Sequence, residues 1–200
     1  LRMGFVPVEH RRIFRCRVRD LAARQVAQPQ DGLVFKSLAA VDTERLALCR
    51  EQILAVCRQA FEEQGMSRHF TDPILLARLP GIDYIMALME KNFAHVPLDR
   101  FLVAIEPTTD EVCGFSAIGR KPGLGETTFT QLLSAVHTAY RGQGVYGGLT
   151  RLLSETLPQD ATLLNVVQTG NRAIQKAYQG SGRLHLADTV VLRRVFDVSD

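Results

Sequence analysis

The sequence has little cysteine, and the few cysteines it has are not grouped. Cys16, Cys49, Cys57 and Cys113 form no C-x-x-C pair and no cluster with histidine, so neither a metal site nor a disulfide framework is predicted. Cys49 and Cys57 fall on one face of a predicted helix among leucines, which is typical of small buried apolar side chains. We therefore expect a reducing compartment, the cytoplasm.

Long hydrophobic runs are also missing. No apolar stretch approaches the roughly 18 residues that a membrane-spanning helix needs, and the first residues lack the apolar core of a signal peptide. We therefore expect no membrane partner. Aromatic residues do not alternate with basic ones, so we expect no nucleic-acid partner either. The 200 residues, 46% apolar and 22% charged, suit one globular domain, alone or with an extension.

Acidic residues are scarce at the start of the chain. Residues 1–30 hold seven arginines against Glu9 and Asp20. From Ile13 to Asp20 arginines alternate with apolar residues, which predicts a half-buried strand. Two interpretations of its arginine face stay open. The strand is a solvated edge strand, or the arginines contact an acidic partner such as a phosphate group of a substrate. We expect residues 1–32 to form an N-terminal extension to a domain spanning 33–200.

Hydrophobic periodicity predicts an α/β (α+β) domain, with a mixed, mostly antiparallel sheet flanked by helices. After a loop over 22–32, the expected elements are a strand at Leu33–Leu38, a helix from Asp42 or Thr43 to Gly65, a short helix from Pro73 to Leu79, a helix at Gly81–His95, strands at Phe101–Glu106, Val112–Gly119 and Thr128–His137, a helix at Val145–Leu157, a strand at Thr162–Gln168, a helix from Asn171 to Gly180, and closing strands at Arg183–Asp188 and Val190–Phe196.

A glycine-rich turn at 141–147 joins a predicted strand to a predicted helix. The first N–H groups of a helix are unpaired, and its dipole places about half a positive charge there. Glycines at 142, 144 and 147, with Arg141 beside them, let a bulky anion approach. The turn therefore predicts a pyrophosphate site. Its G-x-G-x-x-G spacing also fits a dinucleotide fold, but the next strand ends without the acidic residue that holds a ribose.

The same turn resembles the [QR]-x-x-G-x-[GA] motif of the GCN5-related N-acetyltransferase (GNAT) superfamily. Arg141 and Gly144 match that motif, whereas Tyr146 stands where it has a small residue.

A second match lies one helix and one strand later. Asn171, Tyr178 and Gly182 resemble the N-x-x-A-x-x-x-Y-x-x-x-G-F pattern of the same superfamily, with Ile174 at the alanine position and Arg183 at the phenylalanine position. The resemblance covers about residues 33 to 197.

The resemblance implies acetyl transfer from acetyl-CoA, as co-substrate, to the primary amine of a small molecule by direct attack in a ternary complex. The turn would hold the CoA pyrophosphate, and the pantetheine arm would pair with Ser134–Val136 where two parallel strands splay apart. A backbone N–H near Ala135–His137 would polarise the thioester carbonyl. The implied cofactor-binding residues are Ser134, Ala135, Val136, His137, Arg141, Gly142, Gln143, Gly144, Val145, Tyr146, Gly147, Asn171 and Tyr178.

Tyr178 stands at the family's general-acid position. A phenol with a pKa of about 10 is neutral at pH 7 and donates a proton to a thiolate whose acid has a pKa of about 8.5. The alternative is that Tyr178 only packs its helix on the sheet. Asn171 similarly either contacts the pantetheine or caps the helix.

The residue that takes the amine proton is not assigned. The candidates by residue type are His69, Asp72, His95, Glu106 and His137.

The long segment from Asp42 to Val96 is expected to shape the acceptor pocket. Gln168, three residues before Asn171, also resembles a pattern of acyltransferases that act on nucleotide-linked amino sugars. The alternative functions are a protein or peptide acetyltransferase, a non-catalytic acyl-CoA sensor and a nucleotide dehydrogenase. The oligomeric state, a homodimer included, stays open.

Overall fold

The computed structural model describes residues 3–22, 32–64, 81–121, 123–124 and 127–196. A seven-stranded sheet with the order β2-β3-β4-β5-β6-β1-β7 runs through the molecule, and all neighbouring strands are antiparallel except β5 and β6. This architecture confirms the predicted fold class. The strands are β1 (Met3–Arg17), β2 (Val34–Ser37), β3 (Phe101–Glu106), β4 (Glu111–Arg120), β5 (Thr128–Val136), β6 (Thr162–Gln168) and β7 (Leu184–Phe196).

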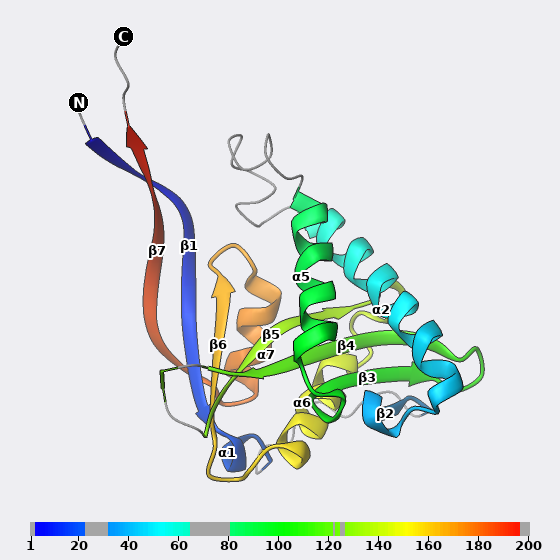
Figure 1. Cartoon of the computed structure of the whole chain (residues 1–200). Coiled ribbons are helices and arrows are strands. Elements are labelled where there is room, and N and C mark those ends of the chain that lie inside the picture. Colours follow the sequence, from blue (N-terminus) through cyan, green and yellow to red (C-terminus); the bar gives the residue numbers. More distant parts are fainter. Residues whose placement is uncertain (1–2, 23–31, 65–80, 122, 125–126, 197–200) are drawn as a thin grey trace.

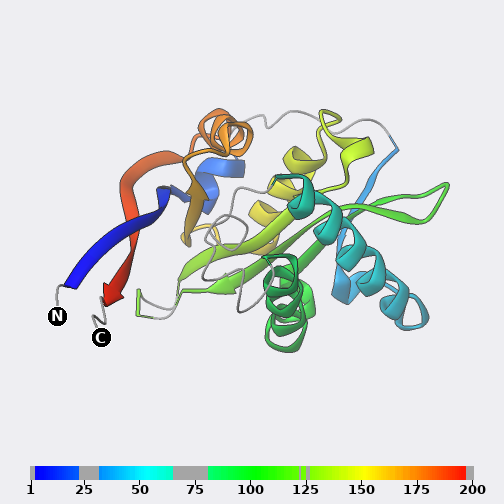
Figure 2. The same ribbon diagram turned by 90° about the horizontal axis from the view of Figure 1, so that it is seen from above.

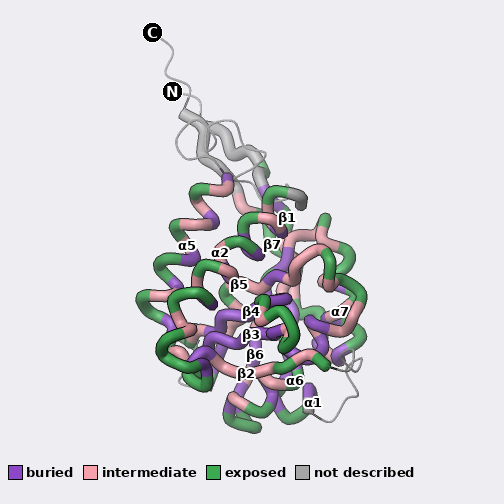
Figure 3. Tube along the Cα trace, turned by 90° about the vertical axis from the view of Figure 1, so that its right-hand side faces the viewer, coloured by how far each residue is buried: buried purple, intermediate pink, exposed green. Residues whose placement is uncertain are grey.

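Helices cover both faces of the sheet (Figures 1 and 2). On β3, Phe101, Val103 and Ile105 face α2 and α5, whereas Leu102 and Ala104 face α6, because side chains alternate along a strand. Buried residues accordingly concentrate in the central strands (Figure 3). The helices are α1 (Val18–Ala22), α2 (Thr43–Gln64), α5 (Gly81–His95), α6 (Val145–Thr156) and α7 (Arg172–Gly180).

Most predicted elements are confirmed to within a residue or two. The helix at Gly81–His95 and the strands at Phe101–Glu106 and Thr162–Gln168 match to the residue. The predicted burial of Cys49 and Cys57 is confirmed, and Cys16 and Cys113 are buried as well. Of the loop predicted over 22–32, Ala22 is the last residue of α1 and residues 23–31 lie outside the described residues, as does the predicted short helix at 73–79. No helix of the described chain is both long and apolar enough to cross a bilayer.

The N-terminal strand differs from its prediction. Its faces are as expected, with Phe14 and Cys16 buried and Arg15 exposed, but it begins at Met3 and ends at Arg17. The N–H of Val18 still bonds to the carbonyl of Ala161, in register with the pairing of β1 and β6, but from Val18 the chain coils into α1. The edge-strand interpretation is wrong, since β1 lies between β6 and β7.

The two predicted closing strands are one strand, β7. No turn separates them because Thr189, at the expected break, keeps its partner Arg11 on β1. β1 pairs with β6 on one side and with β7 on the other, so the two ends of the described chain run side by side (Figure 1).

Candidate functional site

Strands β5 and β6 separate after a short parallel contact. They pair only from Thr128–Thr162 to Thr130–Leu164. Beyond that point β5 stays on β4 as far as Val136, whereas β6 follows β1 to Gln168. The predicted splay is confirmed, and one edge of β5 opens into a fork between the strands.

The hydrogen bonds between β4 and β5 show which backbone amides of β5 face this fork. The N–H of His137 donates to the carbonyl of Cys113 at 2.8 Å. Because bonded and non-bonded positions alternate in an antiparallel pair, the amides of Ser134 and Val136 point away from β4, into the fork. Of the range Ala135–His137 predicted for the amide that polarises the thioester carbonyl, Val136 is the residue whose N–H faces the fork, since the amide of His137 is bonded to β4.

The turn before α6 leaves a cluster of amides at one point. Gly142 and Gly144 have φ values of 80° and 77°, a left-handed conformation that favours glycine. The first helical bond runs from the N–H of Gly148 to the carbonyl of Gly144 at 2.9 Å, so residues 145–147 have no acceptor within the helix. Space is open around Gly142, where an added Cβ would meet no atom within 4 Å. The predicted anion cradle is therefore present in its backbone geometry.

A cavity of about 610 Å³ lies over this turn and the open edge of β5. That volume is ordinary for a small-molecule or cofactor site. The cavity brings together most of the residues predicted to hold CoA, and His137, Gln143 and Tyr178 are not in its wall. Those that line it are Ser134, Ala135, Val136, Arg141, Gly142, Gly144, Val145, Tyr146, Gly147 and Asn171.

A second cavity, of about 410 Å³, adjoins the first. Phe61, Ser134, Asn171 and Ile174 line both, so the two cavities meet along these residues. Tyr178 belongs to the second cavity. The predicted proton donor thus lines the second cavity, with its ring centroid 6.3 Å from that of Tyr146 in the first cavity wall.

Tyr178 is held from several sides. Its ring meets Phe14 edge-on at a centroid distance of 5.3 Å, and the guanidinium of Arg183 lies 4.6 Å from its centroid. Burial, and next the neighbouring Tyr146, raise the pKa of Tyr178 well above its ordinary value, and Arg183 partly offsets this rise. The phenol therefore keeps its proton at neutral pH, and its ring packs α7 on the sheet. Both interpretations of Tyr178, as a general acid and as a packing residue, fit this geometry.

The base of the fork is filled by a polar network that sequence patterns did not reveal. The hydroxyl of Tyr146 donates to Oε1 of Gln131 at 3.0 Å, and Nδ2 of the fully buried Asn165 donates to the same oxygen at 2.7 Å. Nε2 of Gln131 in turn donates to the hydroxyl of Ser116 at 2.8 Å. The only sequence signal was polar residues within otherwise apolar strands. Tyr146, which stands where the resembled motif has a small residue, contributes its hydroxyl to this network.

Arg183, at the phenylalanine position of the second motif, is only 2% exposed. Its Nη1 donates to the hydroxyl of Ser181 at 2.6 Å. Its guanidinium lies over the ring of Tyr178, 4.6 Å from the ring centroid. A flat cation thus covers the face of that ring, which is favourable because the ring face is electron-rich.

Asn171 and His137 both make capping contacts. The side-chain oxygen of Asn171 accepts from the N–H of Ile174 at 3.2 Å, which confirms its capping role at the start of α7. Contact with pantetheine stays a prediction, although Asn171 lines both cavities. Nδ1 of His137 accepts from the N–H of Ala139 at 3.3 Å and caps the short η3 turn (Thr138–Tyr140).

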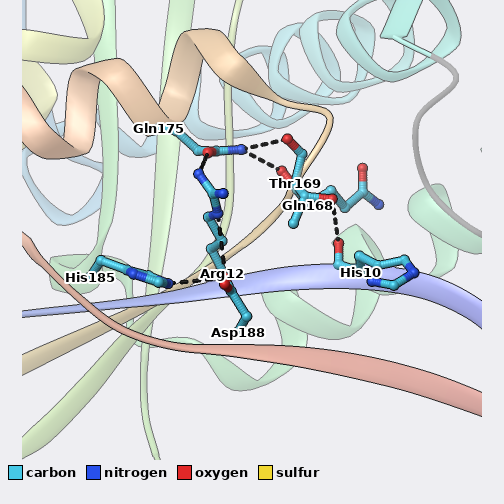
Figure 4. Close-up of polar contacts among 7 residues, drawn as sticks. All are labelled: His10, Arg12, Gln168, Thr169, Gln175, His185 and Asp188. Atoms are coloured by element: carbon cyan, nitrogen blue, oxygen red, sulfur yellow. Dashed lines mark hydrogen bonds and ion pairs between the residues drawn. The ribbon is translucent and has the colours of Figure 1, made fainter.

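Figure 4 shows how α7 is fixed to the strands beneath it. Nη1 of Arg12 donates to Oε1 of Gln175 at 2.7 Å, and Nε2 of Gln175 donates to the carbonyls of Gln168 and Thr169 at 3.0 and 2.8 Å. Nε of Arg12 also lies 3.3 Å from the carboxylate of Asp188 on β7. These contacts set the position of α7, and hence of Tyr178, relative to the fork.

The predicted candidates for the base that belong to the described residues do not line the cavities. His95, Glu106 and His137 are absent from both walls, and His69 and Asp72 lie outside the described residues. The arginines at 15, 17 and 19 do not line either cavity. Within the described chain, no group of three or more His, Cys, Asp or Glu side chains is arranged to hold a metal ion.

Comparison with known proteins adds structural likeness without sequence likeness. No protein-family model matches the chain, and no curated protein matches it in sequence. A functionally unknown protein from Staphylococcus epidermidis is 14% identical, with a TM-score of 0.60 over 93% of this chain and 60% of its own. A GCN5-related N-acetyltransferase from Sphaerobacter thermophilus is also 14% identical, with a TM-score of 0.56 over 96% of this chain and 53% of its own.

A glucosamine N-acetyltransferase region of a fungal multi-domain β-N-acetylglucosaminidase is 11% identical, with a TM-score of 0.56 over 97% of this chain and 21% of that protein. The chain thus spans three fifths or less of the length of these structures. Forked parallel strands beside an amide-lined helix start, together with these likenesses, show that the chain has the fold of the GCN5-related N-acetyltransferases.

Proposed function

We propose that the protein is an N-acetyltransferase that moves an acetyl group from acetyl-CoA to the primary amine of a small molecule by direct attack in a ternary complex. One observation carries the proposal. The cavity over the glycine turn, where unpaired amides face open space, continues along the open edge of β5 and meets a second cavity that contains Tyr178. A cofactor and an acceptor therefore have separate spaces that touch at one place.

The chain's own groups suit each step of this transfer. Amides of residues 145–147 and the side chain of Arg141 bind the pyrophosphate, since a helix start favours anions. The amide of Val136 donates to the thioester oxygen as negative charge develops on it. Tyr178, whose burial keeps its proton in place, gives that proton to the departing thiolate.

An amino sugar is our proposed acceptor. The wall of the second cavity carries amide and hydroxyl groups, among them Thr130, Gln131 and Gln168, and such groups bind sugar hydroxyls. The likeness to a glucosamine N-acetyltransferase region supports the same choice. A protein or peptide acceptor fits less well, because a space of about 410 Å³ holds a small molecule rather than a length of chain.

A thiol-release assay tests the proposal. The protein is incubated with acetyl-CoA and a panel of amino sugars, polyamines and amino acids, and free CoA is measured. We expect release with at least one amine, and a rise in melting temperature with acetyl-CoA alone. Stabilisation by acetyl-CoA without release from any amine would favour a sensor, and the absence of both would reject the proposal.

A further inference from the structure

The second cavity has one buried carboxylate in its wall, that of Glu9 on β1. The Glu9 side chain is 5% exposed. Nη2 of Arg11 lies 2.6 Å from its Oε2, and Nε2 of Gln168 donates to its Oε1 at 2.9 Å. Donors from β1 and β6 therefore hold both oxygens, and the carboxylate has a fixed orientation at the cavity.

Glu9 is the one acidic side chain that the described residues contribute to the wall of either cavity. A carboxylate removed from water is unfavourable unless it is paired. At Glu9 that pairing comes from Arg11, and the same cavity wall carries the buried Tyr178. A group of this kind at a ligand cavity suits an ammonium ion, which donates hydrogen bonds and carries the opposite charge.

Glu9 shares its cavity with Tyr178, and that cavity meets the cofactor cavity at Ser134. A thioester lying along the open edge of β5 would thus be bordered by the β5 amides, with the phenol and the carboxylate beyond them. The acid and the base of an acyl transfer are separate groups that face the same bound substrate, and these two residues line one cavity.

We propose that Glu9 binds the ammonium group of the acceptor and takes its first proton; the inference rests on the proposed function. The amine R–NH₃⁺ gives one proton to Glu9, and its lone pair forms the C–N bond to the thioester carbon. The C–S bond then breaks, and the sulfur takes the proton of Tyr178. The second amine proton replaces that of Tyr178, and Glu9 releases its proton to water, which leaves the amide, CoA–SH and one H⁺.

The other charged and titratable side chains at this cavity are those of Arg11, Lys121, Tyr84 and Tyr178. By residue type these cations and phenols are hydrogen-bond and proton donors, whereas a carboxylate accepts protons. Glu9 is therefore the acceptor that this wall offers to the amine.

The substitution Glu9→Gln tests the proposal with acetyl-CoA and glucosamine, or with whichever panel amine gives the fastest CoA release. We expect kcat/KM for the amine to fall about 100-fold at pH 7, the lower range of general-base effects, while acetyl-CoA still stabilises the protein against heat. The loss should shrink as the pH approaches the pKa of the amine itself, because the amine then arrives without its extra proton. Glu90→Gln, on the exposed face of α5, is the matched control and keeps wild-type kinetics.

Glu9→Asp covers the case in which the glutamine variant does not fold. It keeps the charge beside Arg11 but withdraws the carboxylate from the cavity by one methylene, and we expect at least a tenfold loss in kcat/KM. Wild-type kinetics in either folded variant, or a loss that is the same at every pH, would overturn the role of Glu9. Failure of the wild-type protein to release CoA with any amine would instead reject the proposed function.

Discussion

The ring of Tyr178 is fixed by its neighbours. Phe14 packs against its edge and Arg183 against its face, so the ring has little freedom. Burial also keeps its hydroxyl protonated. The contacts that stabilise α7 on the sheet thus also fix the phenol that we propose as the proton donor at the second cavity.

Replacement of Tyr178 by phenylalanine separates packing from proton donation. The ring contacts remain, so we expect a small change in melting temperature. The proton donor is lost, and kcat for CoA release should fall by about 100-fold or more. Steady-state kinetics of the purified variant measure this, and turnover at the wild-type rate would show that Tyr178 only packs.

Local motifs were sufficient to find part of the site. The turn at 141–147, Asn171 and Tyr178 were predicted because each motif lies within a short stretch of chain. Glu9, Gln131 and Asn165 were not, because they come together only through the pairing of β1, β5 and β6. Tyr146 looked like a departure from a motif until its hydroxyl was found on Gln131.

Elements with a strong hydrophobic period were predicted well, and elements defined by distant pairing were not. α5 and β3 repeat their apolar residues at the spacing of a helix and a strand, which fixes their bounds locally. β7 was divided into two strands because Asp188 and Thr189 resemble turn residues, whereas β1 pairs with both of them.

Helix α6 approaches the sheet closely through Gly148. A Cβ at this position would lie 2.3 Å from the ring of Phe35 on β2. We expect Gly148→Ala to destabilise the protein by about 1–3 kcal/mol, as overpacking does, and to lower the denaturant midpoint. Gly180→Ala is the control: an added Cβ there meets no atom within 4 Å, so stability should be unchanged or slightly higher. Equal midpoints for the two variants would contradict this packing.

For the whole molecule, the buried thiols predict sensitivity to alkali. Burial raises the pKa of Cys57 to about 12 and that of Cys113 to about 11, whereas thiols of the unfolded chain ionise at about pH 8.5. Above that pH the unfolded state holds fewer protons, so the free energy of unfolding falls as the pH rises. Each group contributes a slope of up to about 1.4 kcal/mol per pH unit until its folded pKa is reached.

Urea unfolding under reducing conditions at pH 7 to 10 measures this slope. We expect constant stability up to about pH 8 and a steady decline above it. Cys57→Ala should show a shallower decline, because one of the retained protons is gone. A flat profile up to pH 10 would show that these thiols titrate alike in both states.

The central place of β1 has a consequence for folding. Both of its sheet partners, β6 and β7, belong to the last quarter of the described chain, so β1 pairs across most of the length of that chain. Such long-range pairing is slow, because the entropy of closing a long loop is lost before the contacts form. We therefore expect β1, and with it the cavity wall that carries Glu9, to take its place late in refolding.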